Sequence, residues 1–175
     1  VPLNYIREQG RVVGLQEALM AVVAEGHRQR VYLPPSRAHS VAAQVPIPPD
    51  VPSGELPKNP RDFKTPNYGM TQWADLFTPR QLTALTTFSD LVGEARDRVL
   101  DDALAAGMPS GERLEAGGGG AEAYADAVAT YLAMAISRTL NKSTSICTWD
   151  SSPKMEAVRG LFARQAIPMA WDFAE

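Results

Sequence analysis

The sequence has little of the chemistry on which enzymes and metal sites depend, since it contains one cysteine, Cys147, and two histidines, His27 and His39. A single cysteine excludes an internal disulfide framework and a cysteine-based zinc site within this chain, and it fits a reducing cytoplasm. Both histidines fall in polar or proline-flanked stretches that we expect to be loops, so no Ser-His-Asp or Cys-His arrangement is indicated. We expect Cys147 to be an inert packing residue, with no catalytic residue and no metal site in this chain.

Long apolar runs and nucleotide-binding fingerprints are also missing. No run reaches membrane-spanning length and no basic-plus-apolar signal segment opens the chain, so we expect no membrane partner. The glycine run at 117–120 is not followed by Lys-Ser or Lys-Thr and is not preceded by a strand pattern, which excludes a phosphate-binding loop. We expect residues 107–120 to form a flexible, glycine-rich loop, and we expect no cofactor to bind this chain.

The sequence does have a normal apolar fraction, 45% over 175 residues, which is enough for one domain with a buried core. Its net charge of −3 is unevenly spread. Residues 90–126 hold nine acidic residues against three arginines, whereas residues 138–164 hold five cations against two acids. A globally acidic chain is not a free-standing nucleic-acid binder on charge alone. The basic stretch still leaves a local nucleic-acid-binding patch open.

The first part of the chain predicts a β-hairpin followed by an extended connector. Residues 19–33 contain two short apolar runs around a polar turn with glycine, which is typical of an antiparallel hairpin that covers one face of a helical core. Nine of the fourteen prolines lie within residues 34–66. That density predicts neither a helix nor a central strand, but an extended surface segment near the polyproline II conformation.

Three principal helices are predicted in residues 67–175. Residues 78–81, Thr-Pro-Arg-Gln, form a capping box with proline at the first helical position, so a helix should run over 79–106. The alanine-rich residues 121–140 predict a second helix that packs closely and antiparallel to the first. Ser152 and Pro153 predict the start of a third helix, whose apolar stripe would be Met155, Val158, Phe162 and Ala166. The predicted fold class is therefore α+β, mainly α.

Both ends of the chain are unusual. The sequence opens on Val1 and closes on Trp171, Asp172 and Phe173 with no polar tail. Because chain ends are usually polar and frayed, we expect residues 1–175 to be a single domain excised from a longer protein. The exposed aromatic residues at the end would then pack against a flanking part of that protein.

Two long stretches resemble one protein family. Residues 69–88, Gly-Met-Thr-Gln-Trp-Ala-Asp-Leu-Phe-Thr-Pro-Arg-Gln-Leu-Thr-Ala-Leu-Thr-Thr-Phe, and residues 164–175, Arg-Gln-Ala-Ile-Pro-Met-Ala-Trp-Asp-Phe-Ala-Glu, resemble the large adenine-specific DNA methylases that carry a zinc ribbon. Residues 19–35 are similar to the segment found after the ribbon. The family's glycine-rich S-adenosylmethionine motif, its Asp-Pro-Pro-Tyr motif and the ribbon cysteines do not occur here.

The resemblance implies an inserted region between the two catalytic halves of an S-adenosylmethionine-dependent DNA adenine-N6 methyltransferase. Such a region is not catalytic alone. It often serves target recognition, because a methylase that acts on duplex DNA must extrude its base while other groups grip the phosphates. The partners implied are DNA, through the parent protein, and the flanking catalytic domain of the same chain. The cofactor S-adenosylmethionine is implied for the parent and not for this region.

Under this hypothesis the phosphate contacts are the cations of the basic stretch, namely Arg138, Lys142, Lys154, Arg159 and Arg164. Arg138 and Lys142 have an alternative role, because cations stabilise the C-terminal end of a helix. Lys154 falls in a predicted first turn, where the helix dipole disfavours a cation, so it is expected to face an anion. Arg80 is a weaker candidate, since a capped helix also places such a residue at the surface. Trp149 either stacks on a base or is buried in the core.

A second interpretation belongs to a different class: a helical scaffold or protein-interaction domain without DNA contact. The negative overall charge favours this alternative, and the basic stretch favours the first interpretation. Convergence of the five cations on one surface would favour DNA contact. A third interpretation, an independent enzyme, would require a pocket with catalytic geometry.

Overall fold

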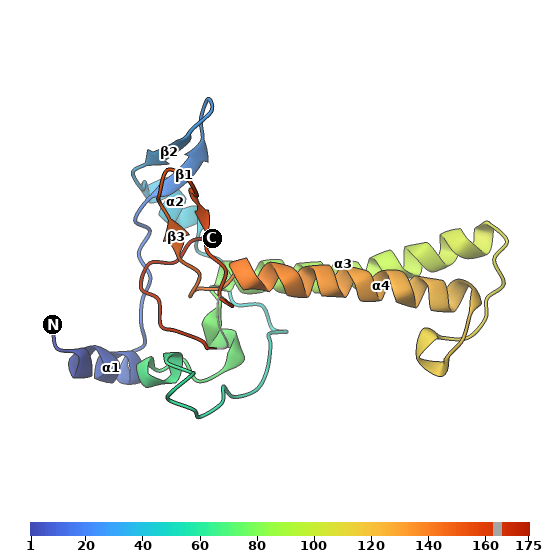
Figure 1. Ribbon diagram of the computed structural model, residues 1–175, viewed down its shortest axis with the longest axis horizontal. Helices are drawn as coiled ribbons and strands as arrows, with labels where there is room; N and C mark the ends of the chain where they lie inside the picture. Colours follow the sequence, from blue (N-terminus) through green and yellow to red (C-terminus); the bar gives the residue numbers. More distant parts are fainter. Residues whose placement is uncertain (163–165) are drawn as a thin grey trace. The chain divides into compact units, whose positions relative to one another are not determined.

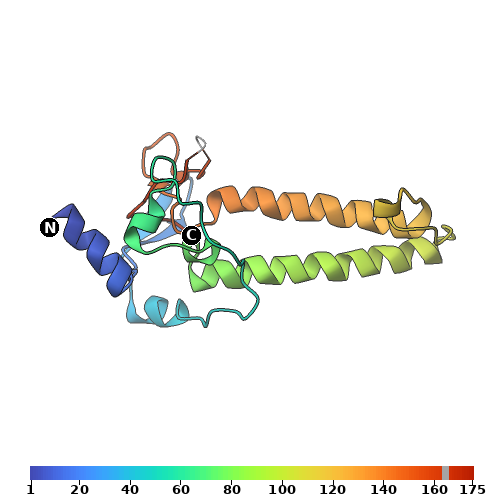
Figure 2. The same cartoon turned by 90° about the horizontal axis from the view of Figure 1, so that it is seen from below.

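The computed structural model describes residues 1–162 and 166–175 (Figures 1 and 2). The chain divides into two compact units: the first combines Val1–Leu82 with Asn141–Glu175, and the second is Thr83–Leu140. The predicted fold class, α+β and mainly α, is confirmed by four α-helices and two small antiparallel sheets among the described residues. None of these helices is long and apolar enough to cross a membrane.

Helix α1 (Leu3–Val12) packs against the 3₁₀ turn η1 (Thr65–Tyr68) in the first unit. Their backbones cross so closely that a Cβ atom added at Gly10 would lie 2.4 Å from the carbonyl oxygen of Tyr68. The Arg7 guanidinium lies over the Tyr68 ring, 5.5 Å from its centroid. A glycine at the crossing therefore allows α1 to reach the rest of this unit.

The predicted hairpin is confirmed and lies within residues 19–33. Strands β1 (Val22–Glu25) and β2 (Arg30–Leu33) pair antiparallel, with Val22 opposite Leu33. Side chains alternate between half-buried and exposed along β1, as in a hairpin with one covered face.

The connector contains a helix that its proline content led us to exclude. Helix α2 (Arg37–Ala42) forms because no proline occurs between Pro35 and Pro46. Its cap is reciprocal: the Ser36 hydroxyl accepts from the His39 N–H at 3.2 Å, and His39 Nδ1 accepts from the Ser36 N–H at 3.3 Å. The prediction of a loop at His39 was therefore wrong, and this histidine serves as part of a helix cap.

The core of the first unit draws on both of its chain segments. The buried cluster consists of Leu56, Leu76, Ile146, Cys147, Leu161 and Ile167. The carbonyl oxygen of Leu76, at the end of the 3₁₀ turn η2 (Trp73–Leu76), accepts hydrogen bonds from the Ser145 N–H at 2.8 Å and the Ser145 hydroxyl at 2.9 Å. Cys147 is 1% exposed, which confirms its packing role.

The third predicted helix does not form in residues 153–162, the part of its span that the structure describes without a gap. In its place strands β3 (Trp149–Asp150) and β4 (Ala157–Val158) pair antiparallel, and Ser152 and Pro153 lie in the turn between them. The buried Asp150 carboxylate accepts from the Ser152 N–H at 2.9 Å and from Arg159 at 2.6 Å. Ser152 and Arg159 can both donate to Asp150 because the chain reverses direction between them. Ser152 and Pro153 therefore lie in a turn, although their sequence is also compatible with a helix start.

Helices α3 (Pro79–Ala105) and α4 (Gly120–Thr139) run antiparallel, as predicted (Figure 2). The capping box of α3 is confirmed: Thr78 Oγ1 accepts from the Gln81 N–H at 3.1 Å, and Gln81 Oε1 accepts from the Thr78 N–H at 3.0 Å. The close approach expected from the α4 alanines is limited, because the two backbones make few close contacts along their length. The buried alanines of α4 are confined to its first turns, next to the connecting loop.

The loop between α3 and α4 has a hydrogen-bonded conformation where we expected a flexible linker. It contains the 3₁₀ turn η3 (Leu114–Ala116), and the Ala121 N–H donates to the Pro109 carbonyl at 2.8 Å. A Cβ atom at Gly111, where φ is +70°, would lie 1.7 Å from the Gly119 carbonyl oxygen. The glycines thus serve close backbone packing in this loop.

Candidate functional site

The predicted phosphate-binding cations are distributed over both units. Arg138 lies in the last turn of α4, in the second unit. Lys142 lies in the 3₁₀ turn η4 (Leu140–Lys142), and Lys154 and Arg159 lie in and just after the β3–β4 hairpin, all in the first unit. Arg164 lies outside the described residues. The four described cations are exposed.

Arg159 is already engaged by a carboxylate of the same hairpin. Its Nε and Nη2 atoms donate to Asp150 Oδ2 at 2.8 and 2.6 Å. Asp150 is 8% exposed. Hydrogen bonds from the Ser152 backbone and hydroxyl, and then from Arg159, hold the pKa of Asp150 at about 2. Since a phosphate would compete with this buried carboxylate, the structure favours a positioning role for Arg159 over a phosphate contact.

Lys142 and Lys154 are the predicted cations that remain available on the first unit. Among the described residues, neither has a carboxylate within ion-pair distance. Asn141 holds the segment after β4 beside η4, because its carbonyl accepts from the Leu161 N–H at 2.7 Å and its Oδ1 accepts from the Phe162 N–H at 2.9 Å. This arrangement brings the chain around Arg159 next to the turn that carries Lys142.

Arg80, the weaker candidate, has a structural role in the first unit. Its guanidinium donates to Glu17 at 2.9 Å, to the Ala43 carbonyl at 2.9 Å, and to Glu175. The hydrogen bonds to Glu17 and then Glu175 raise the pKa of Arg80 above its ordinary value. Glu175 also accepts from the Thr78 hydroxyl at 2.8 Å, at the start of α3. Two carboxylates therefore already neutralise this guanidinium, so a phosphate would have to compete with them for Arg80.

A polar chain joins the two hairpins and was not foreseen from the sequence. Trp149 Nε1 donates to the Tyr32 hydroxyl at 3.2 Å, and that hydroxyl donates to Glu156 Oε1 at 3.3 Å. The Tyr32 and Trp149 rings also meet edge to face, with centroids 6.5 Å apart. Trp149 is half-buried and lies outside the buried cluster of the first unit, so the structure does not place it in the core as one alternative expected; stacking on a base stays a prediction.

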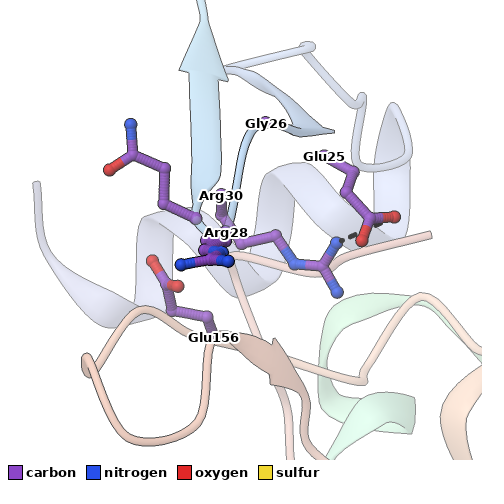
Figure 3. A pocket seen from close by; sticks show the side chains of 6 residues that line it. Glu25, Gly26, Arg28, Arg30 and Glu156 are labelled. Atoms are coloured by element: carbon purple, nitrogen blue, oxygen red, sulfur yellow. Dashed lines mark ion pairs between the residues drawn. The ribbon is translucent and has the colours of Figure 1, made fainter.

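A small polar hollow lies beside this chain (Figure 3). Its volume is about 230 Å³, and it is lined by Glu25, Gly26, Arg28, Gln29, Arg30 and Glu156. Arg28 and Glu156 both have positive φ angles, +58° and +38°, which are uncommon for residues with a side chain. Arg30 pairs with Glu25 at 3.7 Å. The hollow holds two cations and two carboxylates, a mixture that selects neither an anion nor a cation.

The second unit contains an ionic cluster around the buried Asp126, near its loop. Asp126 accepts from Arg96 at 2.7 Å, from Arg113 at 2.6 Å and from the Leu114 N–H at 3.0 Å. Arg96 also donates to Glu122 at 2.7 Å, so one arginine of α3 ties down two carboxylates of α4. Arg113, and to a lesser extent Arg96, hold the pKa of Asp126 at about 2 against the opposing effect of burial. The cluster joins both helices to the loop.

Acid should loosen the second unit through Asp126. Its folded pKa of about 2 lies below its ordinary value of 3.8, so the stabilisation is fully present above pH 4 and is lost as the pH falls toward 2. Far-UV circular dichroism should show an acid transition in that window, since α3 and α4 are the longest helices. In Asp126→Asn this pH dependence should be flattened. The matched variant Asp90→Asn, on an exposed position of α3, should keep it, and equal acid profiles for the two variants would contradict the assignment.

The aromatic residues near the end of the chain make contacts within the first unit. The Trp171 ring packs edge-on against Tyr68, with centroids 5.1 Å apart, and Phe173 bridges to Thr148. Trp171 remains 56% exposed, so its predicted packing against a flanking domain stays a prediction.

Comparison with known proteins adds no relative: no protein-family model, no curated protein and no solved structure matches this chain. Among the described residues, no group of three or more histidine, cysteine, aspartate or glutamate side chains is arranged to hold a metal ion.

Proposed function

We propose that this chain is an inserted, DNA-facing region of an S-adenosylmethionine-dependent DNA adenine-N6 methyltransferase, and that the first unit carries the DNA contacts. The observation that carries the proposal is the pair of exposed lysines, Lys142 and Lys154, which have no carboxylate partner among the described residues. The resemblance of residues 69–88 and 164–175 to the methylase family supports it. Catalysis and S-adenosylmethionine binding are assigned to the flanking domain, since neither motif occurs in this sequence.

The division of charge between the units supports this placement. Residues 83–140 hold nine acidic residues against four arginines, a net charge of −5, whereas the remaining residues hold thirteen cations against eleven acids, a net charge of +2. The phosphates of a DNA duplex repel the acidic second unit, and they repel the first unit less because its net charge is positive. The proposal therefore names Lys142 and Lys154 as phosphate contacts, and it treats Arg159 as the residue that orders their hairpin.

Binding to a duplex over a salt series tests the proposal. Each phosphate contact adds about 0.9 to the slope of log K against log salt, so Lys142→Gln with Lys154→Gln should lower the slope by about 2 and weaken binding similarly for all sequences. Fluorescence anisotropy with a labelled duplex gives the slope. Lys58→Gln, which removes an exposed lysine paired with Glu55 at 3.3 Å, is the matched control. A slope near zero, or one that the double variant leaves unchanged, would remove the basis for DNA contact.

A protein-interaction role is the second candidate, and the second unit favours it. Its charge is acidic, and large apolar side chains on both helices remain exposed, namely Phe88, Leu91, Leu104, Tyr124, Tyr131, Leu132 and Met134. Exposed apolar surface of this extent on two helices is typical of a surface that a protein partner covers.

A further inference from the structure

The polar hollow beside the β1–β2 turn contains a cation that has no carboxylate partner among the described residues. Arg30 is turned toward Glu25 and pairs with it at 3.7 Å, whereas Arg28 lies on the side of Glu156 without an ion pair (Figure 3). Glu156 Oε1 accepts from the Tyr32 hydroxyl at 3.3 Å, and its Oε2 accepts no hydrogen bond from the described residues. One guanidinium and one carboxylate oxygen therefore remain available in the hollow.

The backbone at Arg28 indicates that the stability of the turn does not account for this arginine. Its φ angle is +58°, in the left-handed region that favours glycine and disfavours residues with a side chain. The turn is closed by a hydrogen bond from the Gly26 N–H to the Gln29 carbonyl at 2.8 Å, in which the Arg28 side chain has no part. Glu156, which lines the same hollow, has a φ angle of +38°. Uncommon backbone conformations cluster at ligand sites, so two of them at one small hollow point to a ligand.

We infer that Arg28 and Glu156 read one G·C base pair in the major groove of DNA, an inference that rests on the DNA contact proposed above. In that groove guanine presents two acceptors, O6 and N7, and cytosine presents the N4 amino donor. A guanidinium donates to both guanine acceptors at once, and a carboxylate oxygen accepts from the cytosine amino group. A free anion would meet the carboxylates of the hollow and a free cation would meet its arginines. The edge of a base pair offers donors and acceptors without a net charge, so it matches this mixture.

The surroundings of the hollow fit an element that enters a groove. The major groove is about 12 Å wide and admits a two-stranded β-ribbon, whose strands lie about 4.8 Å apart. Residues 27–30, which form the turn and the start of β2, are exposed. Lys154, a proposed phosphate contact, precedes Glu156 by two residues, which an extended chain spans in about 7 Å. A phosphate held by Lys154 would therefore fix the register of the duplex next to the base pair at the hollow.

Selection by the full chain from a pool of duplexes with a randomised central segment tests the base contact. The wild-type chain should enrich sites with G·C at one position. Arg28→Gly should lose this preference by about 5- to 150-fold, the range for one bidentate arginine–guanine contact. Because glycine is favoured at a φ of +58°, the variant removes the guanidinium without straining the turn. The matched control is Arg30→Gln, which removes the same charge from a side chain of the same hollow that already pairs with Glu25, and it should keep the preference.

Modified bases test which edge of the pair is read. At the selected position, 7-deazaguanine removes the N7 acceptor of the major groove, whereas hypoxanthine keeps O6 and N7 and removes only the amino group in the minor groove. 7-Deazaguanine should weaken binding of the wild-type chain and should have no effect on Arg28→Gly. Hypoxanthine should leave the contribution of Arg28 unchanged. Sensitivity to hypoxanthine in place of 7-deazaguanine would overturn the major-groove contact.

The salt series described above and this selection distinguish the two proposals. A salt slope near zero for the wild-type chain would overturn the DNA contact and the base contact together. A normal slope without any base preference, or a preference that Arg28→Gly retains, would overturn the base contact alone and leave the phosphate contacts in place. Equal loss of preference in Arg28→Gly and Arg30→Gln would also overturn it, because the effect would then follow the charge of the hollow and not the guanidinium of Arg28.

Discussion

Leu76→Ala is expected to lower the free energy of unfolding of the first unit by about 2–5 kcal/mol, the cost of emptying a packed leucine site. Leu76 is 3% exposed and lies in the cluster with Leu56 and Ile146, which come from chain segments on either side of the second unit. Its carbonyl also holds Ser145 through two hydrogen bonds. Because those bonds keep the backbone in place, the cavity cannot close easily, and the upper part of the range is expected.

Tryptophan fluorescence during urea denaturation is the suitable measurement, since Trp73, Trp149 and Trp171 all belong to the first unit. Circular dichroism at 222 nm mainly follows α3 and α4, so the two signals distinguish the units. The fluorescence midpoint of Leu76→Ala should fall well below that of Leu19→Ala, whose side chain is 42% exposed. Equal midpoints for the two variants would show that Leu76 does not belong to a packed core.

Two glycine-to-alanine variants within helices are expected to shift stability in opposite directions. At Gly10 in α1, the new methyl group would lie 2.4 Å from the Tyr68 carbonyl oxygen, so the helix must move off η1, at a cost of about 1–3 kcal/mol. At Gly93 in α3, an added Cβ atom would meet no atom within 4 Å beyond its chain neighbours and the adjacent helix backbone, so alanine should stabilise by about 0.5–1 kcal/mol through its higher helix propensity. The substitution is the same, and only the surroundings differ.

Tryptophan fluorescence and circular dichroism at 222 nm also distinguish these two variants. Gly10→Ala should shift the tryptophan transition, because Trp171 packs against the Tyr68 ring that lies at the crossing. Gly93→Ala should raise the midpoint of the helical signal and leave tryptophan emission unchanged. If Gly10→Ala were stabilising, α1 would not be in contact with η1 in solution.

Elements whose hydrogen bonds join residues close together in the sequence were predictable from the sequence. The capping box at residues 78–81 begins α3 as expected, because both of its hydrogen bonds involve residues three apart and need no tertiary partner. The β1–β2 hairpin follows from two short apolar runs around a turn with glycine.

Signals that depend on distant partners were not predictable. Ser152 and Pro153 are compatible with a helix start, but the buried Asp150 carboxylate and its Arg159 partner make them a turn. For residues 1–18 no element was predicted, although α1 is amphipathic; its glycine crossing with η1 involves residues more than fifty positions apart, which no local pattern indicates. In the connector, counting prolines obscured the proline-free interval in which α2 forms.

The candidate site was predictable only as a list of cations. Exposure and internal pairing decide which of them remain available, and neither property is visible in a charge count. Arg159 and Arg80 look like Lys142 in the sequence, yet both are held by carboxylates of the first unit. The hydrogen-bonded chain of Trp149, Tyr32 and Glu156 spans more than a hundred positions, so no local pattern could indicate it.

The contact between Leu76 and Ser145 also bears on the order in which the chain folds. In an unfolded chain, joining residues 69 positions apart requires closing a long loop, at an entropic cost that grows with loop length. The α3–α4 hairpin is built from contacts that are closer in sequence, and such contacts form sooner. Once the α3–α4 hairpin has formed, the start of α3 and the end of α4 are closer together than in the unfolded chain. The loop that must close between Leu76 and Ser145 is then effectively shorter. We therefore expect the second unit to act as the nucleus, with the core of the first unit closing after it.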